Sequence, residues 1–303
     1  MPFMRYPRLR KHNQHGGLVA SDALLMCFYM QHPNKRIAPA ILRALQTIRE
    51  RIHPYQFAWY DAGEGQAEPL DDFAWEQLHM RTLNPEPDTS AYLILDGPST
   101  KVDDLRVHYR GLDVWPSPWP EQKDGVSVLY VRLPTEFLVE RGADEVRALA
   151  LDVAAELPFN SGYVDFALCS DGRHFDEALK LIRPRYPGVH LAPSRANLRM
   201  NTWVDGVHWM NFLGEPVLGK LGGVSGLRAH LGLPGIILQE MSGDRVLIIL
   251  GTQPEAGDVE AGQALPRHRA LARLLEPCLY RSDMDDFYPA TEDVLRWERR
   301  FLD

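Results

Sequence analysis

The sequence predicts an α+β protein with mixed, largely antiparallel sheets, packed helices and two similar-sized halves. Strand-like and helix-like runs follow one another along all 303 residues, and two pairs of strand-like runs are close enough in sequence to be antiparallel neighbours. A stretch rich in proline and tryptophan divides the chain at residues 113–125. We therefore expect an N-terminal half at residues 1–124 and a C-terminal half at residues 125–303, or a single integrated domain.

The N-terminal half opens with a mostly apolar run at residues 17–31, which we interpret as one or two strands. A helix is expected at residues 37–52, because isoleucine or leucine recurs there at every third or fourth position. Asp71 or Asp72 can cap a second helix that ends before residue 84. Short strands are predicted at residues 58–60, 91–95 and 106–112.

The C-terminal half repeats this alternation of strands and helices. Alternating or β-branched runs predict strands at residues 126–133, 162–168, 235–241 and 245–250. Amphipathic spacing, with proline or glycine at the ends, predicts helices at residues 143–157, 174–182, 219–231, 266–276 and 291–302. The helix at 219–231 contains several glycines, so its pattern is the weakest of the five.

The cysteines and the N-terminal residues indicate the cellular compartment in which the protein is expected. Cys27, Cys169 and Cys278 are far apart and odd in number, which is typical of buried cysteines in a reducing compartment. Basic residues precede the apolar run at 18–30 as in a secretory signal, but Asp22 interrupts the run and no cleavage site follows. No segment approaches the length of a membrane span. We expect a cytoplasmic protein without a membrane partner.

Charge is unevenly distributed along the chain. The net charge is −8, yet residues 1–55 carry +7 and residues 56–104 carry −9. A free-standing nucleic-acid binder usually has the opposite balance, so we expect no direct contact with nucleic acid. An acidic segment can meet a basic partner, and it can equally be solvated surface. Both interpretations stay open from the residues alone.

No set of residues carries a recognisable chemistry. Residues 214–220 fit the first seven positions of a phosphate-binding loop, but Leu221 stands where Ser or Thr must ligate magnesium. Cys169 and His174 could form a nucleophile and its base, although a core cysteine at a strand end fits better. The eleven histidines form no metal-binding motif. We therefore predict no catalytic, cofactor-binding or metal-ligating residues and expect the protein not to be an enzyme.

Four segments of the chain are distinctive: LPFNSGYVDFALC at 157–169, GVHWMNFLGEPVLGKLGG at 206–223, GTQPEAGD at 251–258 and LPRHRALARLLEP at 265–277. Together and in this order they resemble a known family, the TsiV-like immunity proteins of type VI secretion. The resemblance covers roughly residues 125–280, and the N-terminal half fits more loosely. His268 departs from the family pattern, which has tyrosine there.

The resemblance implies an antitoxin that binds a cognate type VI effector inside the cell and blocks it. Effectors of this kind often carry a restriction-endonuclease-like toxin domain, so we expect a nuclease partner neutralised by occlusion. No catalytic residues are transferred from the family. Two alternatives remain: an unrecognised enzyme or small-molecule-binding protein, which requires a deep pocket with convergent polar groups, and an effector-loading adaptor that contacts the secretion spike protein.

A candidate toxin interface follows from the acidic segment. Its carboxylates could imitate the phosphates that a basic nuclease cleft binds. The candidate residues are Asp61, Glu64, Glu68, Asp71 and Asp72. Aromatic side chains are common interface anchors, so Trp115 and Trp119 are added as candidates, although both could instead pack within the fold.

Overall fold

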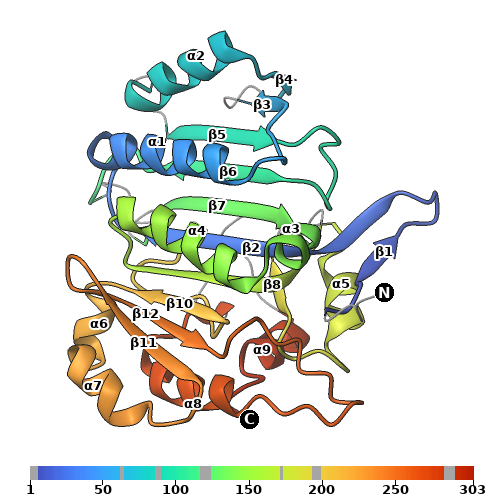
Figure 1. Cartoon of the computed structure of the whole chain (residues 1–303), viewed down its shortest axis with the longest axis vertical. Coiled ribbons are helices and arrows are strands. Elements are labelled where there is room, and N and C mark those ends of the chain that lie inside the picture. The colour runs from blue at the N-terminus through green and yellow to red at the C-terminus, as the bar shows by residue number, and fades with distance from the viewer. Residues whose placement is uncertain are drawn as a thin grey trace.

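The computed structural model describes residues 6–61, 65–85, 90–116, 124–170, 173–192, 199–282 and 291–303. The strands of these residues form one twelve-stranded sheet with helices on both faces (Figure 1). Its strand pairs are antiparallel, except that β9 (His190–Ala192) lies parallel to β8 (Ser161–Ser170). The predicted fold class, α+β with largely antiparallel pairing, is confirmed.

The elements have the following limits. The other strands are β1 (Arg10–His12), β2 (Leu18–Met30), β3 (Trp59–Asp61), β4 (Glu68–Pro69), β5 (Ala91–Asp96), β6 (Arg106–Gly111), β7 (Ser127–Pro134), β10 (Met210–Leu213), β11 (Ile236–Met241) and β12 (Arg245–Leu250). The helices are α1 (Asn34–Arg51), α2 (Asp72–Leu83), α3 (Thr135–Arg141), α4 (Ala143–Glu156), α5 (Phe175–Ile182), α6 (Val217–Lys220), α7 (Gly223–His230), α8 (Pro266–Leu275), the 3-10 turn η2 (Glu276–Cys278) and α9 (Glu292–Glu298).

Strand β2 is the centre of the sheet. The sheet order is β11-β12-β10-β8-β2-β7-β6-β5-β3-β4, so β2 lies between two strands of the C-terminal half. Nearly all of its 13 residues are buried, which explains the continuous apolar run. Asp22 is tolerated in this run because its carboxylate accepts hydrogen bonds from Leu9 N at 2.9 Å and Thr135 Oγ1 at 2.7 Å. The sheet thus continues across the boundary at residues 124/125.

The two faces of the sheet bury different cores. On one face, α1 and α4 pack on the central strands through a large cluster that includes Ile41, Leu45 and Leu149. On the opposite face, α7 and α8 pack on β12 through Leu227 and Leu271. None of the described helices is both long enough and apolar enough to cross a membrane.

Most predicted elements appear within a few residues of their expected limits. The helix predicted at 219–231 is wrong as a single element, because Gly222 adopts φ 78° and separates α6 from α7. Strands β1, β4, β9 and β10 and helix α3 were not predicted. Each is short, so neither the helical nor the strand period is repeated often enough to be recognised.

Candidate interaction surface

The predicted acidic residues gather at one end of the sheet, where β3, β4 and α2 lie at the top of Figure 1. Asp61 is the last residue of β3, Glu68 is the first of β4, and Asp71 and Asp72 begin α2. Hairpin and helix thus bring together side chains that the sequence spreads over twelve positions. The two predicted interface residues outside the described part of the chain are Glu64 and Trp119.

The two carboxylates at the start of α2 both have local contacts. Asp71 accepts a hydrogen bond from Ala74 N at 2.7 Å, which makes it the helix N-cap expected from the sequence. Asp72 lies 3.3 Å from the guanidinium of Arg49 in α1, and its side chain is 100% exposed. An ion pair in such an exposed position contributes little to stability, so the Asp72 charge remains available to a partner.

The two carboxylates of the hairpin also have neighbours. Glu68 accepts a hydrogen bond from the Tyr60 hydroxyl at 2.8 Å, and this bond raises the pKa of Tyr60. Asp61 accepts one from Gly65 N at 3.2 Å and so holds the start of the β3–β4 turn. Both side chains are therefore oriented before any partner arrives.

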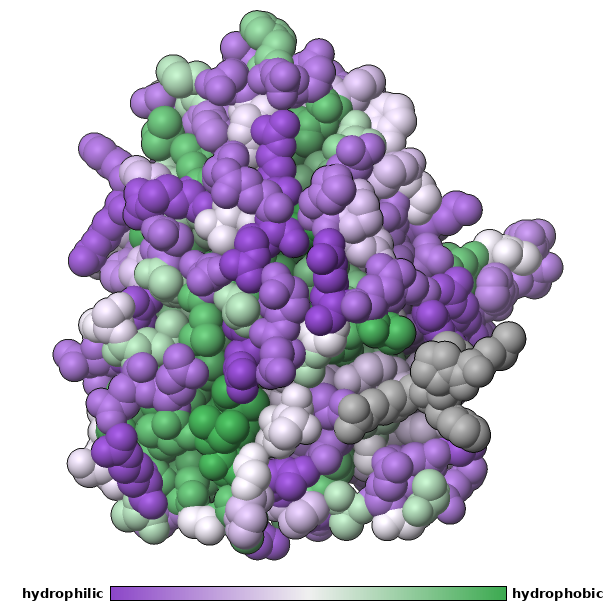
Figure 2. Space-filling view, viewed as in Figure 1, coloured by the Kyte–Doolittle hydropathy of each residue, from purple (hydrophilic) through white to green (hydrophobic). Residues whose placement is uncertain are grey.

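Helix α2 carries an apolar outer face that the sequence analysis did not identify. Phe73, Met80 and Leu83 are exposed by 73%, 56% and 40%, although the helix already buries Trp75 and Leu78 on its inner side. Figure 2 shows apolar side chains at the top of the molecule, where α2 lies in Figure 1. The signal available in the sequence was the spacing of these three residues, which places them on one side of a helix.

Trp115 does not join this group. It lies three residues after Leu112, whose carbonyl accepts a hydrogen bond from Asn34 N at the first residue of α1. Asp72 contacts Arg49, which lies about 22 Å farther along the same helix. The acidic residues are thus together, and Trp115, which is only partly exposed, is at the other end of α1.

A group of polar side chains is buried among β8, β9 and the C-terminal residues. His208 Nδ1 lies 3.3 Å from an Asp165 carboxylate oxygen, and the Tyr163 hydroxyl lies 3.1 Å from His190 Nε2. Burial lowers the pKa of His208 to about 3, raises the pKa of Asp165 and lowers the pKa of Arg300 to about 10. These side chains of β8, β9 and residue 208 are at most 7% exposed, so a substrate cannot reach them, and we interpret the group as polar core.

The other candidate motifs are structural as well. Burial raises the pKa of the Cys169 thiol, the opposite of what a nucleophile needs. In the segment that resembles a phosphate-binding loop, the Glu215 carboxylate accepts a hydrogen bond from Gly219 N at 3.3 Å. This backbone amide therefore already donates to a carboxylate, whereas a phosphate-binding loop requires it to donate to a phosphate. Among the described residues, no three His, Cys, Asp or Glu side chains are grouped so that they could hold a metal ion.

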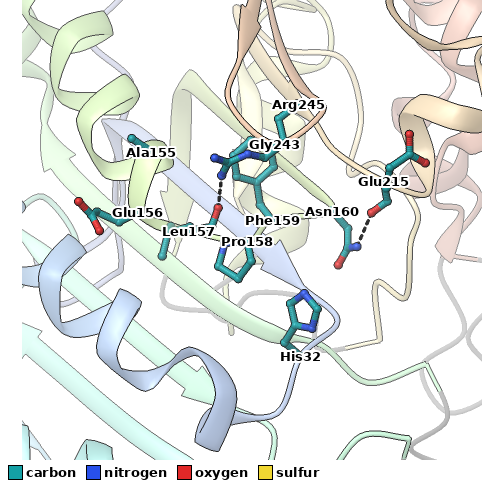
Figure 3. A pocket seen from close by; sticks show the side chains of 10 residues that line it. All are labelled: His32, Ala155, Glu156, Leu157, Pro158, Phe159, Asn160, Glu215, Gly243 and Arg245. Atoms are coloured by element: carbon teal, nitrogen blue, oxygen red, sulfur yellow. Dashed lines mark hydrogen bonds between the residues drawn. The ribbon is translucent and has the colours of Figure 1, made fainter.

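A hollow of about 370 Å³ lies between the end of α4 and the β11–β12 turn (Figure 3). Arg245 Nη1 donates hydrogen bonds to the carbonyls of Ala154, at 3.1 Å, and Leu157. Asn160 Nδ2 donates to the carbonyl of Glu215 at 2.6 Å. These groups are engaged in contacts within the fold, where they hold the end of α4 against neighbouring segments. The walls are formed by His32, Ala155, Glu156, Leu157, Pro158, Phe159, Asn160, Glu215, Gly243 and Arg245.

Comparison with solved structures finds the same fold in another protein. The chain is similar to a Pseudomonas aeruginosa T6SS protein, PA0821, with a TM-score of 0.76 and 19% sequence identity. The match covers 99% of this chain and 88% of that chain. At this level of identity the similarity concerns the fold alone. No curated protein matches the sequence.

The family follows from the sequence itself. The chain belongs to the TsiV family, described as type VI immunity for VRR-NUC, whose sequence model matches residues 40–301. This confirms the resemblance drawn from the motifs of the C-terminal half. It also extends that resemblance, because the match includes most of the N-terminal half, with α2 and the acidic end of the sheet.

Proposed function

We propose that this protein neutralises a type VI effector with a VRR-NUC nuclease domain by binding it and covering its nucleic-acid cleft. It acts in the cytoplasm, where such a toxin meets nucleic acid, and it catalyses no reaction itself. The observation that carries the proposal is membership of a family described as type VI immunity for VRR-NUC, over residues 40–301. The buried polar side chains around His208 are inaccessible to a substrate, and the polar groups that line the hollow are hydrogen-bonded within the fold. Both observations are consistent with a binding role.

Electrostatics favour the acidic end of the sheet as the contact surface. A nuclease holds the phosphates of its substrate with Lys and Arg, so its cleft attracts carboxylates. Residues 56–80 contain six Asp or Glu and no Lys or Arg. The described members of this set belong to one hairpin and one helix. Hydrogen bonds orient the carboxylates of Asp61, Glu68 and Asp71. In this arrangement they imitate a row of phosphates.

The test is co-expression with a candidate type VI effector that carries a VRR-NUC domain, followed by binding measurements on the purified pair. We expect the effector alone to arrest growth, and this protein to restore growth and form a stable complex. Neutralising the acidic end is expected to lower the association rate constant at least about 10-fold and to weaken its dependence on salt. The variant for this purpose is D61N/E68Q/D71N/D72N.

A matched control changes net charge equally at acids that are more than half exposed elsewhere on the molecule. That control variant is D144N/E260Q/E276Q/E292Q. Phosphate mimicry is rejected if both variants bind the effector with the same rate and the same salt dependence. Absence of any complex with the wild-type protein would reject the immunity function itself.

A further inference from the structure

The outer face of α2 combines two properties that seldom occur together on a solvated helix. Phe73, Met80 and Leu83 are the apolar side chains exposed there, and Phe73 is 73% exposed. None of the three belongs to the hydrophobic core formed by the described residues. The opposite side of the helix packs inward through Ala74, Trp75, Leu78 and Thr82. Exposure of a large aromatic ring is unfavourable in water, which points to a partner that covers it.

The helix that carries this face is held rigidly. Asp71 caps its first turn, and the Arg49 guanidinium of α1 lies 4.6 Å from the centroid of the Trp75 ring. Its inner side contacts both α1 and β5. The backbone of a helix anchored in this way does not have to reorganise on binding, and aromatic residues are typical of interface hot spots.

The charges around the apolar face identify the chemistry of its partner. Asp71, Asp72 and Glu76 lie on α2 itself, and Asp61 and Glu68 lie on the adjacent hairpin. On α2 the first Lys or Arg is at position 81, near the end of the helix. An apolar face framed by carboxylates fits a surface with an apolar pocket bordered by Lys and Arg.

We propose that the outer face of α2 is the central contact with the effector, with Phe73 inserted into an apolar pocket beside the basic cleft. The inference rests on the proposed function and adds a position and an anchor to it. Carboxylates speed the encounter and set its orientation, whereas the buried ring determines how long the complex persists.

A second exposed apolar site offers a contrast. Leu233 and Ile237 are exposed by 41% and 44% before and within the edge strand β11. Charges of both signs accompany them, since Arg228 pairs with Glu240 on the same strand. This site has no acidic frame, and it therefore serves as the control.

The experiment measures the affinity of the purified, catalytically inactivated effector for three forms of this protein. F73A/M80A is expected to raise the dissociation constant at least 30-fold, chiefly through faster dissociation, because loss of a hot-spot ring costs about 2 kcal/mol or more. The control L233A/I237A removes the two exposed side chains at β11, and it is expected to change the dissociation constant less than about 3-fold. Thermal unfolding of both variants verifies that the fold is intact.

The outcomes separate the inference from the function on which it rests. If the wild-type protein and F73A/M80A bind the effector equally well, the inference is wrong while the immunity function stands. If the wild-type protein does not bind the effector, both fail. If the free protein is a dimer that F73A/M80A converts to a monomer without loss of effector binding, α2 is a self-association surface and the inference is overturned.

Discussion

At the scale of single residues, the core histidines make stability depend on pH. Burial lowers the pKa of His208 and His268 to about 3, whereas an unfolded histidine titrates near 6.5. Above about pH 6.5 these histidines do not reduce the free energy of unfolding. As pH falls from about 6.5 toward 3, the unfolded chain binds protons that the folded chain does not, so the free energy of unfolding decreases. Burial raises the pKa of Asp205 to about 7, which acts in the opposite sense. The pH dependence of the free energy of unfolding of the wild-type protein therefore contains both increasing and decreasing contributions.

The substitution His268→Leu isolates one of these groups. Neither ring nitrogen of His268 has a hydrogen-bond partner among the described residues, and the ring lies 5.2 Å from that of Phe301, centroid to centroid. An apolar side chain of similar size removes the burial of unpaired polar atoms. We expect the variant to be at least as stable as the wild-type protein at about pH 7. As pH falls from about 6 to about 4, its free energy of unfolding should decrease less steeply than that of the wild-type protein, with a difference in slope of about 1.4 kcal/mol per pH unit.

Urea unfolding at a series of pH values measures this difference. Parallel profiles for H268L and the wild-type protein would contradict the account, since they would mean that His268 binds protons equally in the folded and unfolded chain.

Residue environments were predictable from the sequence only where the partner is near in sequence. The cap formed by Asp71 needs an amide three residues away, and it was expected and found. The burial of Asp22 depends on Thr135, which lies 113 positions away, so the sequence showed only an interruption of an apolar run.

At the scale of elements, α2 has to serve the fold and the proposed contact together, and Asp71 belongs to both. Asp71→Ala removes the cap and is expected to destabilise the protein by about 1 kcal/mol. Asp71→Asn keeps a cap of similar strength while removing the charge. We expect D71A alone to lower the midpoint of urea unfolding, and both variants to slow association with the effector by similar factors.

The comparison distinguishes a structural from an electrostatic role for this residue. Circular dichroism during urea titration and stopped-flow association of the same preparations give the two readouts. Slow association of D71A together with wild-type association of D71N would assign Asp71 to capping alone.

Elements were predicted well where one face is apolar and the other polar. Helices α1 and α4 were found because their buried residues recur at helical spacing. Helix α2 was found from its cap, but its apolar residues lie on two sides. Periodicity therefore could not tell the inner side from the outer, and the exposed Phe73 was missed as a candidate.

At the scale of the whole molecule, the order of strands could not be derived from the sequence. Strand β2 pairs with β7 and β8, at least 97 positions farther along the chain, and such pairings leave no local pattern. The proline-rich stretch at 113–125 looked like a junction between halves, and the sheet nevertheless continues past it. Strands of both halves therefore depend on β2 for their hydrogen bonds.

This dependence predicts how the protein unfolds and how it can be divided. Expressed alone, residues 1–124 would hold β2 without its neighbours β7 and β8, and residues 125–303 would lack the strand between them. A long apolar strand with two open edges favours aggregation, so we expect neither fragment to be soluble and folded. The full chain should unfold in one transition, with equal calorimetric and van't Hoff enthalpies. Two separate transitions, or a fragment with dispersed amide resonances, would instead establish two independent domains and localise the proposed effector contact to the first.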